Sequence, residues 1–509
     1  MRLSELLVGA DVAAVCADAD FEVGSFRIHS GEVGDGDLFF CMKGSRDDGN
    51  LHLGEVHADF VAVTETKPET DCRYVLVKDV RRAYAVMSEN FWGRPAEGMK
   101  FVAVVGTNGK TSTAHYIASL LSAAGFRTGI IGTEGHFIDG EKVGASLTTP
   151  DSFELNELLF KMRARGVDVV AAEVSAHAIK LEKTAGINAD VAVFTNLTRD
   201  HLDYFRTFGE YKETKLSYFS PGNVRKAVVN ADDPYGRELM ARAEESGLPL
   251  VSYGLENPAD SFAVNVREDM DGVRFVANLS DDIVEVKSHL MGEFNVYNLL
   301  AAMTAVHEMG VSAETLTHAV RKVKAVKGRF SVLKNDRGSV IIDYAHTPDG
   351  LENLLRTARL LTKSRLITVF GCGGERDRGK RAVMGAVAAK YSDFTVVTSD
   401  NPRFEDPERI IADVVQGMKG ADYKTFVDRT EAVAYAMSEM AEGDTVVIAG
   451  KRQRGLSGHP RKEGAVQRLR RGAQVGTGKM KPGVLLLVYL IVSAVLALAT
   501  APFAVRALR

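Results

Sequence analysis

The sequence has few cysteines, and this scarcity excludes two classes of protein. Its four cysteines among 509 residues show none of the paired spacing of a zinc site. A chain of this length with so few cysteines does not depend on a disulfide framework, and a reducing compartment fits. The formal net charge of −4 provides no bulk basic field for nucleic acid. The N-terminus lacks a basic start followed by an apolar run, so we predict no signal peptide and a cytoplasmic protein.

The length and the apolar pattern predict a three-domain α/β protein. Hydrophobic residues make up 45% of the chain, which is ordinary for a globular protein. Strands are predicted at 36–44 and 59–65, and from residue 99 apolar strands alternate with helical stretches. This alternation predicts a mostly parallel sheet with helices on both faces. The further strands are expected at 101–105, 167–174, 190–195 and 226–230, and, after a linker at 323–329, at 339–344, 365–370, 394–399 and 444–449. The predicted domains are an N-terminal domain (1–98), a central P-loop-type ATPase domain (99–327) and a C-terminal Rossmann-like domain (328–450).

The segment 101–121 carries the strongest functional signal. An apolar strand leads into a loop that contains Gly106 and Gly109, and a helix follows. Glycines let the loop fold tightly and turn its N–H groups toward phosphate oxygens, while the helix adds the positive end of its dipole. Lys110 can then reach the β- and γ-phosphates of ATP, and the Thr111 hydroxyl can bind Mg²⁺. A Gly-rich turn with a solvated lysine does not explain strand, loop and helix together.

Polar residues follow two further predicted strands. Glu173 ends one strand, and Asn196, Asp200, His201 and Asp203 lie just past another. Ligands in open α/β sheets gather beyond the carboxyl ends of strands, so we expect these side chains to converge on the phosphate loop. A carboxylate such as Glu173 suits Mg²⁺, whereas histidine is a less usual ligand. Taken one at a time, a solvated strand end and a capping histidine are the ordinary alternatives.

A predicted helix at 211–219 carries Lys212 and Lys215. Taken by itself, this pattern favours a solvated basic face and indicates no chemistry.

Eight motifs in one order resemble the Mur ligase family, over a span from about residue 20 to Lys451. They are GTNGKTS (106–112), EVSAHAI (173–179), TNLTRDHLDYF (195–205), YKETK (211–215), GEFNVYNLLAA (292–302), DYAHTPDGL (343–351), GCGGERDRGKR (371–381) and DNPR (400–403). The resemblance implies a UDP-binding N-terminal domain, a central ATPase domain and a C-terminal Rossmann-like domain. These agree with the boundaries read from the apolar pattern.

The resemblance also implies roles for single residues. The metal ligands would be Thr111, Glu173, His201 and Lys215, with Lys215 carbamylated so that it offers the oxygen atoms that a hard metal prefers. The nucleotide contacts would be Gly106, Thr107, Asn108, Gly109, Lys110, Thr111, Ser112, Asn298 and Arg329. The catalytic residues would be Lys110, Lys215, His201, Asp343 and His346, and either histidine could take the proton of the incoming amine.

For the UDP-sugar dipeptide, the resemblance implies contacts from Ser30, Thr148, Thr149, Ser175 and Lys183. The chain departs from the family at two of these positions. The family usually has D-S-R where this sequence has His-Ser-Gly around Ser30, and it often has arginine where Lys183 stands. The contacts from the Ser30 loop are therefore the less secure ones.

Members of the family with the DNPR motif add meso-diaminopimelate to UDP-MurNAc-L-Ala-D-Glu at the expense of ATP, through an acyl phosphate. The implied contacts are Arg376, Asp400, Asn401, Pro402 and Arg403. Diaminopimelate has a distal carboxylate that lysine lacks, and an arginine offers a planar fork that binds a carboxylate with two hydrogen bonds. We expect a monomeric diaminopimelate-adding ligase. A lysine-adding ligase, folylpolyglutamate synthase, and an impaired ligase that only binds ATP and the UDP substrate are the alternatives.

The chain departs from the family pattern after Lys451. A basic segment (451–479) replaces the residues that hold the amino end of diaminopimelate in the family, and an apolar segment (480–509) follows. Residues 484–505 carry no charge, and a segment of this length is long enough to span a membrane. A shifted reading frame is one explanation of this tail, and a C-terminal membrane contact is the other.

Overall fold

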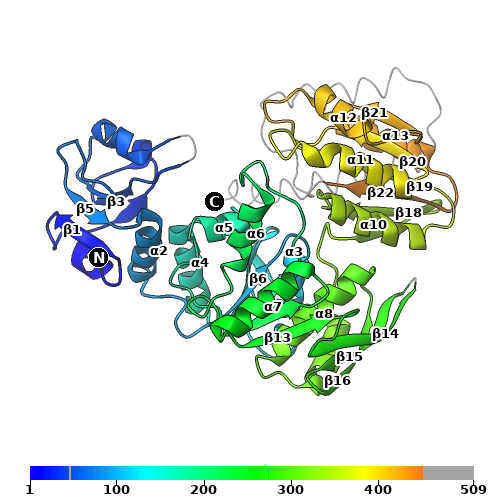
Figure 1. The fold of residues 1–509 in the computed structure, drawn as a ribbon, viewed down its shortest axis with the longest axis horizontal. Coiled ribbons are helices and arrows are strands. Elements are labelled where there is room, and N and C mark those ends of the chain that lie inside the picture. Colours follow the sequence, from blue (N-terminus) through cyan, green and yellow to red (C-terminus); the bar gives the residue numbers. More distant parts are fainter. Residues whose placement is uncertain (45–46, 270, 451–509) are drawn as a thin grey trace, which may run out of the picture. The chain divides into compact units, whose positions relative to one another are not determined.

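The computed structural model describes residues 1–44, 47–269 and 271–450 (Figure 1). The chain divides into two compact units: one comprises Met1–Arg199 and Phe205–Lys324, and the other comprises Asp200–Tyr204 and the chain from Ala325 onward. Both tail segments, 451–479 and 480–509, lie outside the described residues, and so do the predictions made for them. Within the described part, no helix has the length and apolar character needed to cross a membrane.

The N-terminal part of the first unit is a five-stranded sheet with two α-helices. Its elements are α1 (Leu3–Leu6), β1 (Val12–Cys16), β2 (Ser25–Arg27), η1 (Ser30–Glu32), β3 (Asp37–Phe40), η2 (Gly49–Glu55), β4 (Val61–Thr64), β5 (Tyr74–Val77) and α2 (Val80–Phe91). The strand order is β1-β5-β4-β3-β2, and all neighbours are parallel except β1 and β5. The strands predicted at 36–44 and 59–65 are confirmed as β3 and β4.

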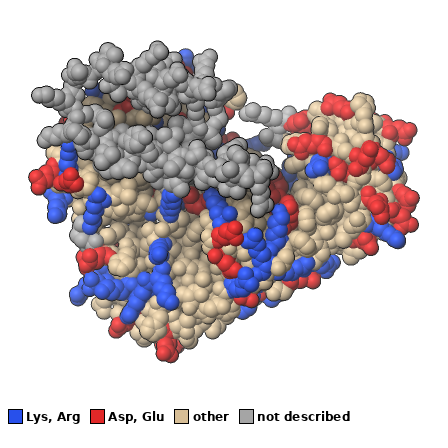
Figure 2. All heavy atoms as spheres, turned by 180° about the vertical axis from the view of Figure 1, so that it is seen from behind, with Lys and Arg blue, Asp and Glu red and all other residues tan. Residues whose placement is uncertain are grey.

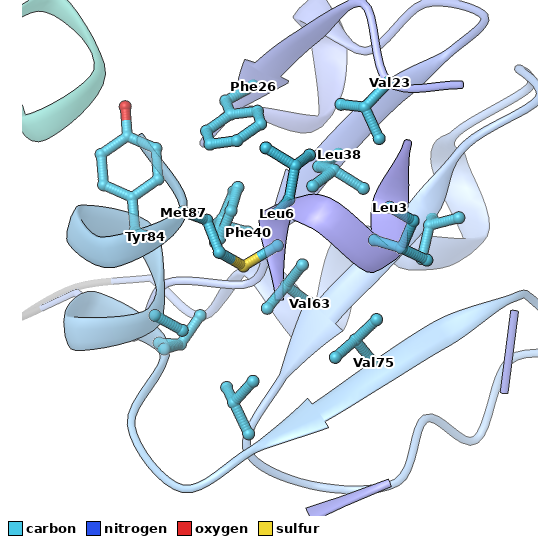
Figure 3. Close-up of a cluster of buried hydrophobic side chains, with 14 residues drawn as sticks. Leu3, Leu6, Val23, Phe26, Leu38, Phe40, Val63, Val75, Tyr84 and Met87 are labelled. Atoms are coloured by element: carbon cyan, nitrogen blue, oxygen red, sulfur yellow. The ribbon is translucent and has the colours of Figure 1, made fainter. Parts of the chain in front are cut away.

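An apolar core holds both helices on this sheet (Figure 3). Tyr84 and Met87 are three positions apart on α2 and therefore share one face, which packs near Phe40 of β3. Leu3 and Leu6 are likewise three positions apart on α1 and belong to the same core, and both are fully buried. A buried side chain of this size contributes about 1.5–3 kcal/mol. Burial of these faces, more than helix propensity, keeps such short helices in place.

The central part of the first unit contains one large sheet with helices around it. Its elements are β6 (Lys100–Val105), α3 (Lys110–Ala123), β7 (Thr128–Gly132), β8 (Gly135–Ile138), β9 (Glu141–Gly144), α4 (Ser152–Ala164), β10 (Val169–Glu173), α5 (Ala176–Lys180), β11 (Val191–Phe194), α6 (Phe208–Leu216), β12 (Ala227–Asn230), α7 (Pro234–Ser246), β13 (Leu250–Gly254), β14 (Ser261–Asp269), β15 (Gly272–Leu279), β16 (Asp282–Ser288), α8 (Glu293–His307), α9 (Ala313–Ala319) and η3 (Val320–Lys322). The strand order is β16-β15-β14-β13-β12-β11-β6-β10-β7-β8-β9.

The centre of this sheet is parallel, from β14 to β7. Strands β10, β11 and β12 are buried at every position, as expected for strands covered on both faces. The prediction of a mostly parallel sheet is thus confirmed. The antiparallel additions at its two ends, β8–β9 and β15–β16, were not predicted. Because the parallel strands end at one edge, the residues that follow them gather there.

The described residues of the C-terminal unit form a six-stranded sheet with four helices. Its elements are β17 (Ser331–Lys334), β18 (Gly338–Asp343), α10 (Pro348–Leu361), β19 (Leu366–Phe370), α11 (Gly379–Tyr391), β20 (Phe394–Thr398), α12 (Pro407–Val415), β21 (Tyr423–Phe426), α13 (Arg429–Glu439) and β22 (Asp444–Ala449). The strand order is β17-β18-β22-β19-β20-β21, and only β17 is antiparallel to its neighbour. The four strands predicted in this region are confirmed as β18, β19, β20 and β22.

Charged side chains of both signs are mixed on the face of the molecule in Figure 2. Ion pairs join α6 to α7: Lys212 and Arg242 contact Glu238, and Arg242 also contacts Glu213. Exposed ion pairs contribute only about 0–1 kcal/mol each. Two of these residues, Lys212 and Glu213, lie on α6, the helix that also carries Lys215.

Candidate active site

The phosphate loop between β6 and α3 is pressed against α8. Gly109 has a φ of 84°, in the left-handed region that favours glycine. A Cβ atom at this position would lie 2.5 Å from Oδ1 of Asn298 on α8. That oxygen also accepts a hydrogen bond from the Thr113 hydroxyl at 3.3 Å. The structure therefore places Asn298, a predicted nucleotide contact, directly against the loop, and the approach is so close that only glycine fits.

The loop is also held from the end of β11. The N–H of Thr107 donates to the backbone oxygen of Asn196 at 2.8 Å, and the N–H of Asn108 donates to its side-chain oxygen at 2.9 Å. Lys110 folds back over the loop, where its Nζ donates to the carbonyl oxygens of Gly106 and Thr107 at 2.8 and 2.9 Å. An ammonium in this position could donate to phosphate oxygens held by the loop in place of these carbonyl oxygens.

Glu173, at the end of β10, is 1% exposed and lies beside the phosphate loop. Its carboxylate accepts hydrogen bonds from the Thr111 hydroxyl at 3.0 Å and from Thr133, through the N–H at 2.7 Å and the hydroxyl at 2.9 Å. Two of the predicted metal ligands are thus brought together, and their hard oxygen atoms are the kind that Mg²⁺ prefers. Thr133 was not predicted, although its place just after β7 is a signal for it.

Three predicted substrate residues lie close to Glu173, through its backbone oxygen and through Thr133. The Thr149 hydroxyl donates to the backbone oxygen of Glu173 at 2.8 Å, and the N–H of Ser175 donates to the Thr149 hydroxyl at 3.1 Å. The hydroxyls of Thr148 and Thr133 lie 2.9 Å apart. A substrate carboxylate held by these hydroxyls would lie beside the phosphate loop, as phosphoryl transfer requires.

The other two predicted substrate residues have separate partners. Lys183 is 7% exposed, and its Nζ lies 2.7 Å from the carboxylate of Asp151. Ser30 lies in η1, where its hydroxyl donates to Glu55 at 3.4 Å. Its hydrogen bond is therefore made within the N-terminal part rather than to the hydroxyls around Glu173.

Lys215 is not part of a solvated basic face, contrary to what the helix pattern alone favours. It is 2% exposed, and its Nζ lies 3.4 Å from the Thr107 hydroxyl of the phosphate loop. The Tyr211 ring lies against the same ammonium at 4.6 Å. Lys212, in contrast, reaches the surface carboxylate of Glu238. The structure thus separates the two lysines of one helix into a site residue and a surface residue.

His201 belongs to the short segment Asp200–Tyr204, which groups with the C-terminal unit. Its ring lies 3.4 Å from Asp200, a buried carboxylate that also lies 3.8 Å from His346 and 3.4 Å from Lys380. Burial raises the pKa of Asp200, but its electrostatic interactions with His201, His346 and Lys380 outweigh burial and hold the pKa well below its usual range. Because Glu173 lies in the other unit, the structure does not bring these two predicted metal ligands together within one unit. In the part of the chain that the structure describes, no three His, Cys, Asp or Glu side chains form a metal-binding group.

Asp343 ends β18 and His346 follows it, next to Arg329. Asp343 accepts hydrogen bonds from the N–H groups of Phe330 and Ala345, and burial raises its pKa against the opposing charge of Arg329. The loss of water around the imidazole lowers the pKa of His346 to about 4, although 40% of the side chain stays exposed. His346 is therefore neutral at pH 7, which allows it to accept a proton but makes it a weak base.

The loops after β19 and β20 carry the predicted diaminopimelate residues and lie against each other. The N–H of Gly374 donates to the backbone oxygen of Asn401 at 2.9 Å, and the Arg403 guanidinium donates to the backbone oxygen of Gly374. Arg376 forms an ion pair with Asp203 at 2.7 Å. The N–H of Arg403 donates to the Asn401 side chain, which folds the DNPR loop on itself. Arg376 and Arg403 are thus carried by two loops in direct contact.

Comparison with known proteins agrees with this geometry. The family model of the Mur ligase middle domain matches residues 104–306, and that of the Mur ligase glutamate ligase domain matches residues 328–452. A curated relative from Syntrophomonas wolfei, a UDP-N-acetylmuramoyl-L-alanyl-D-glutamate–2,6-diaminopimelate ligase, is 41% identical over 464 residues. The alignment covers 89% of this chain and 94% of the relative.

Solved structures show the same fold. One titled as the structure of a UDP-N-acetylmuramoyl-L-alanyl-D-glutamate–2,6-diaminopimelate ligase is 29% identical, with a TM-score of 0.65 over 94% of this chain and 100% of that one. Folylpolyglutamate synthase of Mycobacterium tuberculosis, complexed with ADP and AMPPCP, has a TM-score of 0.62 at 19% identity and covers 73% of this chain and 92% of that one. At that identity the likeness concerns the fold alone. The two family models and the close relative establish that this chain belongs to the Mur ligase family.

Proposed function

We propose that this chain is an ATP-dependent ligase that joins meso-2,6-diaminopimelate to UDP-MurNAc-L-Ala-D-Glu during peptidoglycan precursor synthesis. The observation that carries the proposal is the contact between the two arginine-bearing loops, which puts Arg376 and Arg403 in one region of the C-terminal unit. The name of the relative that is 41% identical supports the same substrates. We place the reaction in the cytoplasm, where the four free cysteines would stay reduced.

The reaction joins a carboxylate and an amine in two steps. The γ-phosphoryl group of ATP moves to the D-Glu carboxylate, which gives an acyl phosphate and ADP. The amine of diaminopimelate then attacks the acyl carbon, phosphate leaves, and the amine loses a proton. In the first step the protein mainly positions the groups and neutralises charge, because phosphoryl transfer needs little covalent help from it.

The residues of the first unit fit these tasks. Lys110 would place its charge on the phosphates, and the hydroxyls of Thr149 and Ser175 would hold the substrate beside Glu173. Glu173 and Thr111 would hold Mg²⁺, which supplies positive charge against the phosphate oxygens. Asn298 would fix the loop from α8. In the C-terminal unit, His346, whose pKa is lowered by burial, could accept the proton of the amine.

The specificity for diaminopimelate would come from its distal carboxylate. A guanidinium binds a carboxylate through two parallel hydrogen bonds, and lysine offers no such group at that end. With lysine as substrate, the charge of Arg403 would stay without a carboxylate partner from the substrate. Leaving such a group unpaired costs on the order of 2–5 kcal/mol.

The test measures release of ADP and phosphate by the purified chain. Reactions contain ATP, Mg²⁺ and the UDP-dipeptide, with diaminopimelate, with lysine or with no amino acid. We expect release and a product of the added mass only with diaminopimelate, and none from the Lys110→Ala variant. Equal use of lysine would overturn the specificity. Binding of ATP and the UDP-dipeptide without any turnover would identify an impaired ligase instead.

A further inference from the structure

A buried arginine that the proposed mechanism does not use lies beneath the two arginine-bearing loops. Arg381, in the first turn of α11, is 1% exposed. Its Nη1 donates to the carboxylates of Glu405 and Asp413 at 3.0 and 2.9 Å, and its Nη2 donates to Glu405 at 2.9 Å. Nη2 also lies 3.3 Å from the backbone oxygen of Gly373. One guanidinium thus joins the loop after β19, the loop after β20 and helix α12.

Glu405, in the loop after β20, also binds residues of the loop after β19. Besides Arg381, it accepts hydrogen bonds from the N–H of Glu375 and from Arg378 at 3.3 Å. Glu375 directly precedes Arg376, and Glu405 stands two residues after Arg403. Arg376 therefore follows a residue whose N–H is bound by the Glu405 carboxylate, and Arg403 lies two residues before Glu405 itself.

The backbone of the second loop makes its position depend on this anchor. Arg403 has a φ of 50°, a left-handed conformation that costs about 1–2 kcal/mol in a residue other than glycine. The N–H of Glu405 donates to the backbone oxygen of Pro402 at 2.9 Å, so the turn around Arg403 is closed by the residue that Arg381 holds. Strained conformations persist only where the surrounding structure fixes them.

We propose that the ion pair between Arg381 and Glu405 is a positioning device that sets the distance between Arg376 and Arg403, and thereby the selection of diaminopimelate over lysine. The inference rests on the proposed function, because it concerns how that substrate is read. Arg381 and Glu405 would not touch the substrate. A carboxylate bound by two guanidinium groups requires both at one spacing, and small displacements of such groups reduce binding strongly.

The test compares Glu405→Gln with Asp444→Asn in the full chain. Glutamine keeps the shape of Glu405 and removes its charge. Asp444 is a matched control, since it is 0% exposed and accepts two hydrogen bonds from the Arg365 guanidinium at 3.2 and 2.8 Å, together with backbone N–H groups. It begins β22, at the end of the sheet opposite to the two loops, because parallel strands start at one edge and finish at the other.

We expect Glu405→Gln to raise the KM for diaminopimelate at least ~10-fold, or about 1.4 kcal/mol, with the KM for ATP and for the UDP-dipeptide changed less than ~2-fold. The preference over lysine should fall by a similar factor. Asp444→Asn should lower the melting temperature and leave all three KM values near those of the unsubstituted chain. If Glu405→Gln lowers only the melting temperature, as Asp444→Asn does, the pair is structural and the inference fails.

A double variant shows whether Glu405 acts through Arg403. In an Arg403→Ala background, Glu405→Gln should change the KM for diaminopimelate less than ~2-fold, since residues that act as one unit are not additive. Full additivity would overturn the inference. Should Glu405→Gln not fold, Arg381→Lys, which keeps the charge but loses the fork, provides the same comparison. If the unsubstituted chain does not use diaminopimelate at all, the proposed function fails before the positioning question arises.

Discussion

The ammonium of Lys215 lies 3.4 Å from the hydroxyl of Thr107, so a lysine of α6 touches the phosphate loop. The two residues are 108 positions apart in the chain. The Tyr211 ring lies 4.6 Å from the same ammonium. A carbamate would remove the cation: CO₂ adds to the neutral amine, an N–C bond forms and a proton is released. The product offers oxygen atoms beside the loop where Mg²⁺ is proposed to bind.

Lys215→Ala should therefore lose most ligase activity, at least the ~10- to 100-fold that loss of a metal-site partner typically costs. A small added carboxylate should restore part of it, because it can replace the carbamate oxygens. The matched control is Lys212→Ala on the same helix, whose ammonium pairs with Glu238 at the surface. Activity is measured by phosphate release with and without bicarbonate. Full activity of Lys215→Ala in CO₂-depleted buffer would contradict the carbamate.

Gly109→Ala should weaken ATP binding at least ~10-fold, or about 1.4 kcal/mol. The new Cβ would lie 2.5 Å from Oδ1 of Asn298, so either the loop or α8 must move. Gly125→Ala is the matched control, since its φ of 96° brings the same backbone strain but no atom lies within 4 Å of its Cβ. Calorimetry of ATP binding separates the two effects. Equal losses of affinity would show that backbone strain alone, and not contact with α8, sets the requirement for glycine.

Arg403→Ala should raise the KM for diaminopimelate sharply and narrow the gap to lysine. The lost ion pair with the distal carboxylate is expected to cost on the order of 2–5 kcal/mol. Arg409→Ala, on α12 a few residues away, removes a guanidinium whose side chain is 87% exposed and should leave both KM values unchanged. Steady-state kinetics with both amino acids provides the measurement. An unchanged preference in Arg403→Ala would assign the specificity elsewhere.

The contribution of Glu405 to stability should depend on pH in a defined direction. Hydrogen bonds from Arg381 lower the pKa of Glu405 from the ordinary 4.5 to about 2. A carboxylate with a lowered pKa stabilises the folded state above its unfolded-state pKa, and this stabilisation is lost as the pH falls toward the folded-state value. The difference in melting temperature between the unsubstituted chain and Glu405→Gln should be largest near pH 7 and should shrink between pH 4.5 and about 2. A difference that stays constant over that range would show that the charge of Glu405 does not provide it.

Much of the fold could be predicted because its signals are local. Apolar runs placed β6, β10, β11 and β12 correctly, and the glycine pattern at the phosphate loop identified the strand–loop–helix unit. The hairpins β8–β9 and β15–β16 were not predicted. β9 is four residues long and mostly exposed, which gives little signal, whereas β16 alternates buried and exposed positions as a half-buried strand does. The helix with Lys215 was placed correctly, but its pattern alone indicated the wrong environment for that lysine.

The candidate site was only partly predictable, because many of its contacts join residues that are far apart in the sequence. Thr133 follows a strand and Arg381 ends a family motif, but neither pattern shows which partners they and Glu405 have. Those partners lie 40, 24 and 30 residues away. Strand order decides such partnerships, because it determines which strand ends become neighbours. The phosphate loop, the alternation of strands and helices, and the motifs of the family depend on backbone conformation and periodicity over a few residues, so the linear chain specifies them. The close fit of Asn298 on Gly109, the burial of Lys215 beside Thr107 and the Arg381–Glu405 pair exist only after distant segments pack, since burial and charge pairing are properties of the assembled core.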